Sequence, residues 1–149
     1  MKILSLLILF PIFMSTQSQN LDQIRIDYRN AISEKDLCRE MLHNFDKTDN
    51  KEIYLAYYGA LQAIWAKHTN NPFEKLRSFN SGKKNLDSAI TQRPDLFEAR
   101  FLRYGIQKQS PAFLNYKNDM KEDRDFLMKN IGGIQNPLLK QMGYQILKN

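Results

Sequence analysis

The feature that most constrains the fold of this chain is a recurring helix-start signal, a capping residue followed directly by proline. It occurs three times, as Asn71-Pro72, Ser110-Pro111 and Asn136-Pro137. Asn and Ser side chains accept hydrogen bonds from the first helical turn, and Pro lacks the N–H that this turn leaves unpaired. No segment alternates apolar and polar residues long enough for a half-buried strand, and no Asn-Gly or Asp-Gly pair indicates a β-hairpin. The sequence therefore predicts an all-α protein.

Further signals divide the chain into six expected helices. Asp49 with Glu52, and Asp95 with Glu98, have the spacing of capping boxes, and Gly132-Gly133 predicts a helix end in the left-handed conformation. The second helix is apolar on nearly every side, so we place it at the centre of the fold. The predicted ranges are 21–46 with a possible break near 33–36, then 50–68, 72–92, 96–109, 111–131 and 137–148.

Residues 1–18 have the features of a secretory signal peptide. The positive charge of Lys2 precedes an apolar run over residues 3–13, and small polar residues with signal-peptidase spacing end at Ser18. The run is shorter than the roughly 20 residues that a membrane-spanning helix needs. An uncleaved N-terminal anchor is the alternative. We therefore expect an exported protein, periplasmic or extracellular, without a stable membrane span and with one mature domain over residues 19–149.

Charge and cysteine content narrow the expected partners. The chain has 22 Lys and Arg against 16 Asp and Glu, a net charge of +6, and a single cysteine, which excludes an internal disulfide framework. Cys38 lies on an apolar stripe, so we expect a buried structural thiol, with a reactive or intermolecular thiol as the alternative. Export and dispersed charge argue against nucleic-acid binding and favour an acidic partner in the cell envelope.

The most specific pattern is an internal repeat with an offset of 46 residues. Asp49-x-x-Glu52-x-x-Leu55-x-x-Tyr58-Gly59 matches Asp95-x-x-Glu98-x-x-Phe101-x-x-Tyr104-Gly105, with four identical residues and a large apolar residue in both copies at the remaining named position. We expect each glycine to lie on an inner helix face, where it lets a neighbouring backbone approach closely. The repeat predicts two helical hairpins in tandem, at about 49–92 and 95–131.

These residues resemble the tetratricopeptide repeat (TPR). Leu55-x-x-Tyr58-Gly59 and Phe101-x-x-Tyr104-Gly105 are similar to the large residue and Leu-Gly pair of its first helix, with Tyr in place of Leu. Four residues match the spacings of its second helix: Gly82, Leu86, Ala89 and Pro94. The layout also resembles that of small exported all-helical bacterial proteins of unknown role. The resemblance implies a TPR-like helical array and says little about function.

The chain offers little for catalysis or metal binding. It contains no Gly-x-Ser-x-Gly, P-loop or dinucleotide fingerprint. Its two histidines, His43 and His68, lack the His-x3-His spacing of metal sites, and His68 suits a helix C-terminus. Acidic and basic residues alternate over 119–125, as is typical of a solvated, self-paired helix face. We therefore predict no catalytic residue, metal or cofactor.

The residues suited to recognition are basic and aromatic. Arg100 and Arg103 are neighbours on one helix face beside Tyr104, an arrangement that suits an acidic peptide, a phosphate headgroup or a polyanionic glycan. A solvated basic face is the alternative. The candidate binding surface comprises Arg100, Arg103, Tyr104, Lys83, Lys84, Tyr57, Tyr58 and Trp65.

Together these features predict a noncatalytic interaction or scaffold protein that binds a protein or peptide partner. The alternative is a small binder or enzyme for an apolar or acidic ligand, because aromatic side chains with polar tips suit such a pocket. Core packing accounts for the same side chains equally well. The pocket would be lined by Tyr54, Tyr57, Tyr58, Trp65 and Tyr104.

Overall fold

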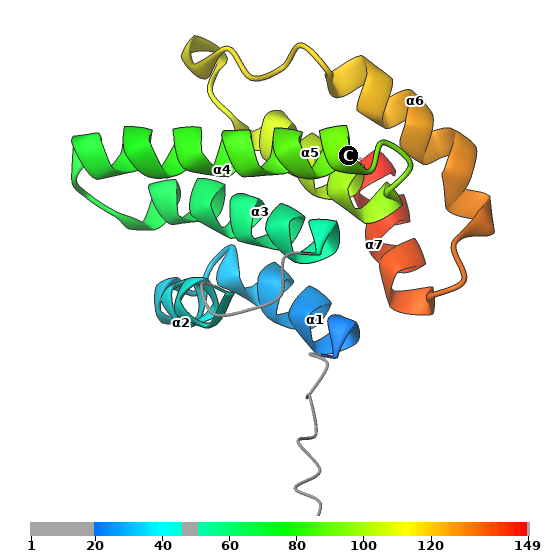
Figure 1. Cartoon of the computed structure of the whole chain (residues 1–149), viewed down its shortest axis with the longest axis horizontal. Coiled ribbons are helices and arrows are strands. Elements are labelled where there is room, and N and C mark those ends of the chain that lie inside the picture. Colours follow the sequence, from blue (N-terminus) through cyan, green and yellow to red (C-terminus); the bar gives the residue numbers. More distant parts are fainter. Residues whose placement is uncertain (1–19, 46–50, 149) are drawn as a thin grey trace, which may run out of the picture.

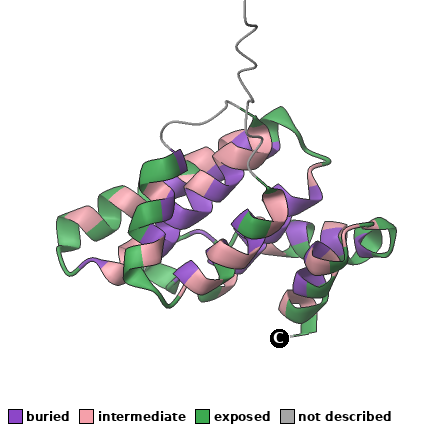
Figure 2. Cartoon of the chain, turned by 90° about the horizontal axis from the view of Figure 1, so that it is seen from below, coloured by how far each residue is buried: buried purple, intermediate pink, exposed green. Residues whose placement is uncertain are grey.

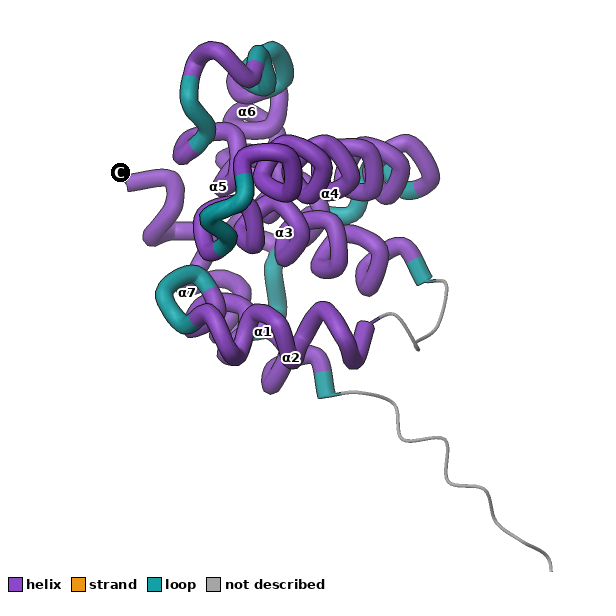
Figure 3. The backbone as a smooth tube through the Cα atoms, turned by 90° about the vertical axis from the view of Figure 1, so that its left-hand side faces the viewer, coloured by secondary structure: helices purple, strands orange, loops and turns teal. Residues whose placement is uncertain are grey.

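The computed structural model describes residues 20–45 and 51–148, and within these ranges every regular element is a helix (Figure 3). The prediction of an all-α fold is confirmed. The predicted signal peptide, residues 1–18, and the predicted capping residue Asp49 lie outside the described residues. The α-helices of the described part are α1 (Leu21–Ala31), α2 (Lys35–Phe45), α3 (Glu52–His68), α4 (Pro72–Gln92), α5 (Phe97–Gln109), α6 (Met120–Asn130) and α7 (Pro137–Lys148). Two 3-10 turns, η1 (Ala112–Leu114) and η2 (Ile131–Gly133), flank α6.

Two of the three cap-proline signals start α-helices as predicted. The side chain of Asn71 accepts hydrogen bonds from the backbone N–H groups of Phe73 and Glu74, at 3.0 and 3.2 Å, and opens α4. Asn136 accepts from the backbone N–H of Leu139 at 2.9 Å and opens α7. The expected break near residues 33–36 is also present, since a turn separates α1 from α2.

The third signal, Ser110-Pro111, does not start an α-helix, and the prediction of one helix over 111–131 is wrong. Ser110 ends α5 instead, because its hydroxyl donates backward to the carbonyl oxygen of Ile106 at 2.7 Å. Only the short turn η1 follows, and it closes at Asn115 in the left-handed conformation, with φ of 48°. The second predicted hairpin, 95–131, is therefore α5 joined to the shorter α6 by an irregular link.

The predicted capping box Asp95–Glu98 is wrong, and the box Asp49–Glu52 includes a residue outside the described ranges. The N-cap of α3 is Lys51 and that of α5 is Leu96, and neither makes a side-chain capping hydrogen bond. Glu98 is buried and used elsewhere, as described below. At the end of α6, neither Gly132 nor Gly133 has positive φ, so the chain leaves this helix through the turn η2 rather than through a left-handed glycine.

The helices are arranged around two central members, α3 and α5. Helices α3 and α4 run side by side as an antiparallel hairpin, with α1 and α2 on the far side of α3 from α4 (Figure 1). The predicted central helix, α3, contacts α1, α2, α4 and α5. Helix α5 contacts α3, α4, α6 and α7, and all its residues from Phe97 to Gln107 are buried. Figure 2 shows buried residues on the facing sides of neighbouring helices and exposed residues on the outer sides.

The closest approach in this arrangement lies between α3 and α4. A Cβ atom on Gly59 would lie 2.8 Å from both the carbonyl oxygen of Gly82 and the backbone nitrogen of Leu86. Backbone therefore meets backbone here, as predicted for Gly59. The matched Gly105 instead faces a side chain, with Ile146 Cδ1 of α7 at 2.9 Å from an added Cβ. The two segments of the predicted repeat thus have different surroundings.

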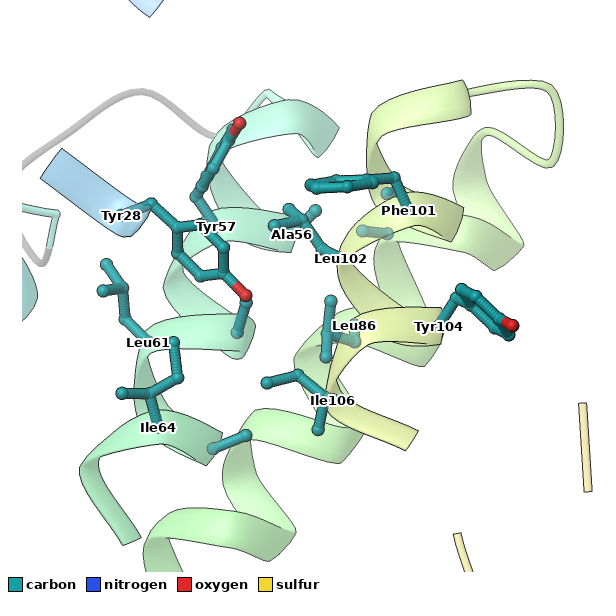
Figure 4. Packing of buried hydrophobic residues seen from close by; sticks show 14 of the residues in the cluster. Tyr28, Ala56, Tyr57, Leu61, Ile64, Leu86, Phe101, Leu102, Tyr104 and Ile106 are labelled. Carbon is teal, nitrogen blue, oxygen red and sulfur yellow. The ribbon is translucent and has the colours of Figure 1, made fainter. Parts of the chain in front are cut away.

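The hydrophobic core fills the space between α1, α3, α4 and α5 (Figure 4). Leu61, Leu86 and Leu102 are fully buried, one from each of three helices. The rings of Tyr28 and Tyr57 pack edge to face, with their centroids 5.5 Å apart. This core holds the ends of α3, α4 and α5 in fixed positions, and the candidate site lies at those ends.

Candidate functional site

Arg100 and Arg103, expected on a surface, are buried in ion pairs with α6. Arg103 binds Asp123 through two hydrogen bonds, Nε to Oδ2 at 2.7 Å and Nη2 to Oδ1 at 2.8 Å. Arg100 Nη1 donates to the same Asp123 at 3.0 Å and to the exposed Glu122 at 2.8 Å. The expectation that these arginines form a ligand-binding or solvated face is therefore wrong. Of the α6 charges expected to pair among themselves, Lys121 and Asp125 do so at 2.6 Å, whereas Glu122 and Asp123 pair with the arginines of α5.

The network extends to α4 through Asp87. This carboxylate accepts hydrogen bonds from Arg103 Nη1 at 3.2 Å and from the hydroxyl of Tyr116 at 3.1 Å. Burial, with Asp87 nearby, raises the pKa of Tyr116 well above its usual range. Lys83 lies over the ring of Tyr116 at 5.0 Å, whereas Lys84 is exposed. The groups of this network bind one another, so it ties α4, α5 and α6 together.

A second buried ion pair joins α1 to α5. Arg25 holds Glu98 in a two-point contact, with Nε to Oε1 and Nη2 to Oε2 both at 2.7 Å. Tyr57 of α3 donates its hydroxyl proton to Glu98 Oε1, and burial raises the pKa of this phenol. Such bidentate pairs are geometrically specific, and their removal leaves a buried charge without a partner. Glu98 therefore has a structural role, because Arg25 and Tyr57 bind its carboxylate.

The aromatic residues expected to form one pocket point to different surroundings. Tyr57 faces Glu98 in the core, and Tyr104 is buried with Lys108 over its ring at 5.4 Å. Trp65 is half-buried, donates to Glu74 Oε1 at 2.7 Å, and lies beneath two cationic side chains of α2. Tyr54 and Tyr58 are half-buried as well. None of these five aromatic residues lines the groove at the ends of α3 and α5 or the smaller hollow between α1, α5 and α7.

The structure contains a different candidate site, an apolar groove of about 530 Å³. It lies where the end of α3, the start of α4, the end of α5 and the turn η1 meet. We call it the apolar groove. Its apolar lining includes Ala63, Leu76, Phe79, Ile106, Pro111 and Phe113.

Large apolar side chains at the rim of the groove are open to solvent. Phe113 is 83% exposed and Leu76 is 53% exposed, although both line the groove. Phe73, beside the groove-lining Pro72, is 85% exposed. Contiguous exposed apolar surface of this kind is typical of sites that bind another molecule. The sequence predicted a long helix over 111–131, which would have placed Phe113 on a core stripe. Pro111, directly after Ser110, was the sequence signal available for the turn η1.

The only charged side chains among the described residues that line this groove are two lysines, and no Asp or Glu lies among them. Lys67 Nζ donates to Gln109 Oε1 at 3.2 Å. Lys75 is exposed and makes no ion pair with any residue in the described ranges. The groove therefore combines an apolar floor with an unneutralised positive rim.

The remaining reactive side chains have structural surroundings. Cys38 is fully buried, as predicted, and burial raises the pKa of its thiol to about 12. His68 Nε2 lies 2.9 Å from the carbonyl oxygen of Ala31, and His43 is exposed. Residues 20–45 and 51–148 hold no group of three or more His, Cys, Asp or Glu side chains placed to bind a metal ion. No described helix is both long and apolar enough to cross a bilayer.

No protein family matches this chain, and comparisons with curated proteins and with solved structures give no match. The interpretation of the apolar groove therefore depends on its own geometry and chemistry.

Proposed function

We propose that this protein is a noncatalytic interaction module whose apolar groove receives an amphipathic helix of a partner protein. The observation that carries this proposal is the combination of an apolar floor, exposed Phe113 and Leu76 at the rim, and two lysines that pair with no carboxylate of the described residues. The predicted signal peptide would place this module, and hence its partner, in the cell envelope. A TPR-like origin of the helical hairpins is part of the same proposal.

The exposed rim favours a helix over a small ligand. A site for a small molecule typically buries 70–90% of its ligand within a concave cavity. Phe113 and Phe73 are more than 80% exposed, so an occupant confined to the floor would leave them in water. An amphipathic helix laid along a groove presents apolar residues at i, i+3, i+4 and i+7 and covers both floor and rim. Strand addition has no template, because the described residues contain no sheet edge.

The positive charges of the groove lining favour a partner helix with acidic residues beside its apolar stripe. Lys67 and Lys75 lie on the groove lining, and their ammonium groups would pair with Glu or Asp beside the apolar stripe of the partner. Exposed pairs contribute little affinity individually but select the partner and its orientation. The net charge of +6 adds a long-range attraction for an acidic partner.

The buried ionisable groups support a noncatalytic role. An acid–base catalyst must reach substrate within hydrogen-bond distance. Glu98 and Asp123, the most buried carboxylates of the described chain, are each held by an arginine and line neither hollow. The proposal therefore assigns function to the surface at the groove.

The test uses two synthetic amphipathic peptides with the same leucine stripe, one with Glu and one with Lys at its polar positions. Fluorescence anisotropy should show binding of the Glu peptide, and Phe113→Ser should weaken it by about tenfold, the effect of removing one aromatic side chain that the bound helix covers. Tyr144→Ser, on the exposed face of α7 and outside the groove, is the matched control. The proposal is overturned if the two variants bind alike. It is also overturned if dodecanoate binds more tightly than the peptide, because the small-ligand alternative would then hold.

A further inference from the structure

A second hollow adjoins the apolar groove. It has a volume of about 210 Å³ and lies between α1, α5 and α7. Its lining includes the apolar side chains of Ile32, Phe101, Met142 and Ile146. Gln109, the last residue of α5, lines both this second hollow and the apolar groove, so the two share a boundary at the end of α5.

A single exposed hydrogen bond marks that boundary. Lys67 Nζ donates to Gln109 Oε1 at 3.2 Å, and both side chains are exposed. The acceptor is a neutral amide oxygen. A carboxylate is the stronger acceptor for an ammonium group, since hydrogen bonds between two charged groups are shorter and stronger. An acidic residue of a bound partner would therefore form an ion pair with Lys67, and the hydrogen bond between Lys67 and Gln109 would break.

The second hollow repeats the charge pattern of the groove. Arg29 lines it, is exposed, and has no ion-pair partner in the described part of the chain. Among the described residues lining either hollow, three are cationic and none is acidic: Lys67, Lys75 and Arg29. Some exposed basic residues elsewhere pair with acidic neighbours, as in Lys121–Asp125 and Arg39–Asp36, whereas others, such as Arg124, make no ion pair with a described residue. What distinguishes the two hollows is that their described linings contain basic side chains and no acidic one.

We infer that one acidic amphipathic helix spans both hollows, with its apolar stripe over the groove and the second hollow and with acidic residues facing Lys67 and Arg29. This inference rests on the proposed function and extends it, because it sets the length and charge pattern of the partner segment. The partner segment needs apolar residues over both the groove and the second hollow. It also needs acidic residues near its middle, to face Lys67, and at one end, to face Arg29.

The test measures anisotropy of the Glu peptide, about 20 residues or roughly 30 Å long as a helix, against variants of the second hollow. Arg29→Glu reverses a charge at the mouth of this hollow, and Gln145→Trp fills it from an exposed position on α7. Arg124→Glu is the control, since Arg124 is exposed on α6, lines neither hollow, and gives the same change of net charge. Far-UV circular dichroism checks that each variant is folded.

We expect Arg29→Glu to weaken binding at least about threefold more than Arg124→Glu does, the size of one lost exposed ion pair and its reversal. Gln145→Trp should weaken binding by at least the same factor. If Phe113→Ser weakens binding while both second-hollow variants match the control, the occupant is confined to the groove. In that case this inference fails and the proposed function stands. If Phe113→Ser has no effect, the proposed function itself fails.

Discussion

Replacing Gly82 by alanine tests the close crossing of α3 and α4. A Cβ atom at this position would lie 2.7 Å from the backbone nitrogen of Ala63 and closer still to the carbonyl oxygen of Gly59. Ordinary van der Waals contact begins at 3.4 Å. The two helices would therefore have to separate by at least about 0.7 Å in a core that packs like a crystal.

The magnitude follows from two opposing terms. Overpacking a core typically costs 1–3 kcal/mol, and the obstacles here are backbone atoms that cannot rotate away, so we take about 3 kcal/mol. Alanine is a better helix former than glycine by about 1 kcal/mol, which offsets part of that cost. We expect Gly82→Ala to lower the free energy of unfolding by about 2 kcal/mol. For a domain of this size that corresponds to a fall in Tm of roughly 6 °C.

The assay is urea and thermal denaturation followed by far-UV circular dichroism. Gly132→Ala is the control, because a Cβ on Gly132 would meet nothing within 4 Å and its φ is not positive. That variant should stay within about 0.5 kcal/mol of the wild type. If Gly82→Ala is as stable as the wild type or more stable, helix propensity outweighs the clash, and the backbone contact between α3 and α4 is not as close as described.

Three further predictions concern buried groups. Asp123→Asn should lower the free energy of unfolding by about 3 kcal/mol in urea titrations, because Arg100 and Arg103 would lose the fully buried carboxylate that they share and keep only more exposed partners. Stability should fall as pH rises past 10, because burial raises the pKa of the phenols of Tyr57 and Tyr116 and only the unfolded chain ionises them at their usual pKa of 10. Urea midpoints at pH 8 and pH 11 measure this fall, and Tyr116→Phe should reduce it. Cys38, with its thiol pKa raised to about 12, should react with Ellman's reagent at pH 8 only as fast as the protein opens; rapid labelling of the folded protein would contradict its burial.

Local signals in the sequence predicted the helices well where the deciding contacts are close along the chain. Asn71 caps α4 through the N–H groups of residues two and three positions later, so the contact forms whatever the rest of the fold does. Asn136 opens α7 in the same way. The residues of α3 are apolar on nearly every side of the helix, which likewise predicted its central position, since such a helix must be covered on several sides.

The same signals failed where a side chain had a competing partner. Ser110 bonds backward to Ile106 and ends a helix instead of starting one. Glu98 has the spacing of a capping residue, but it pairs with Arg25, which lies 73 positions earlier in the chain. Local spacing cannot detect such a partner, because only the packing of α1 against α5 brings Arg25 to Glu98.

The sequence by itself determined that this chain is helical and where most helices begin, because helix caps and amphipathic stripes depend on residues within a turn or two of each other. Only the tertiary structure decided which charges are free. Arg100 and Arg103 are buried because Asp123 of α6 lies against them, whereas Lys67, Lys75 and Arg29 line the two hollows and pair with no acidic residue of the described ranges. The candidate site is built from the ends of several separate elements, so it exists only once helix packing has brought those ends together.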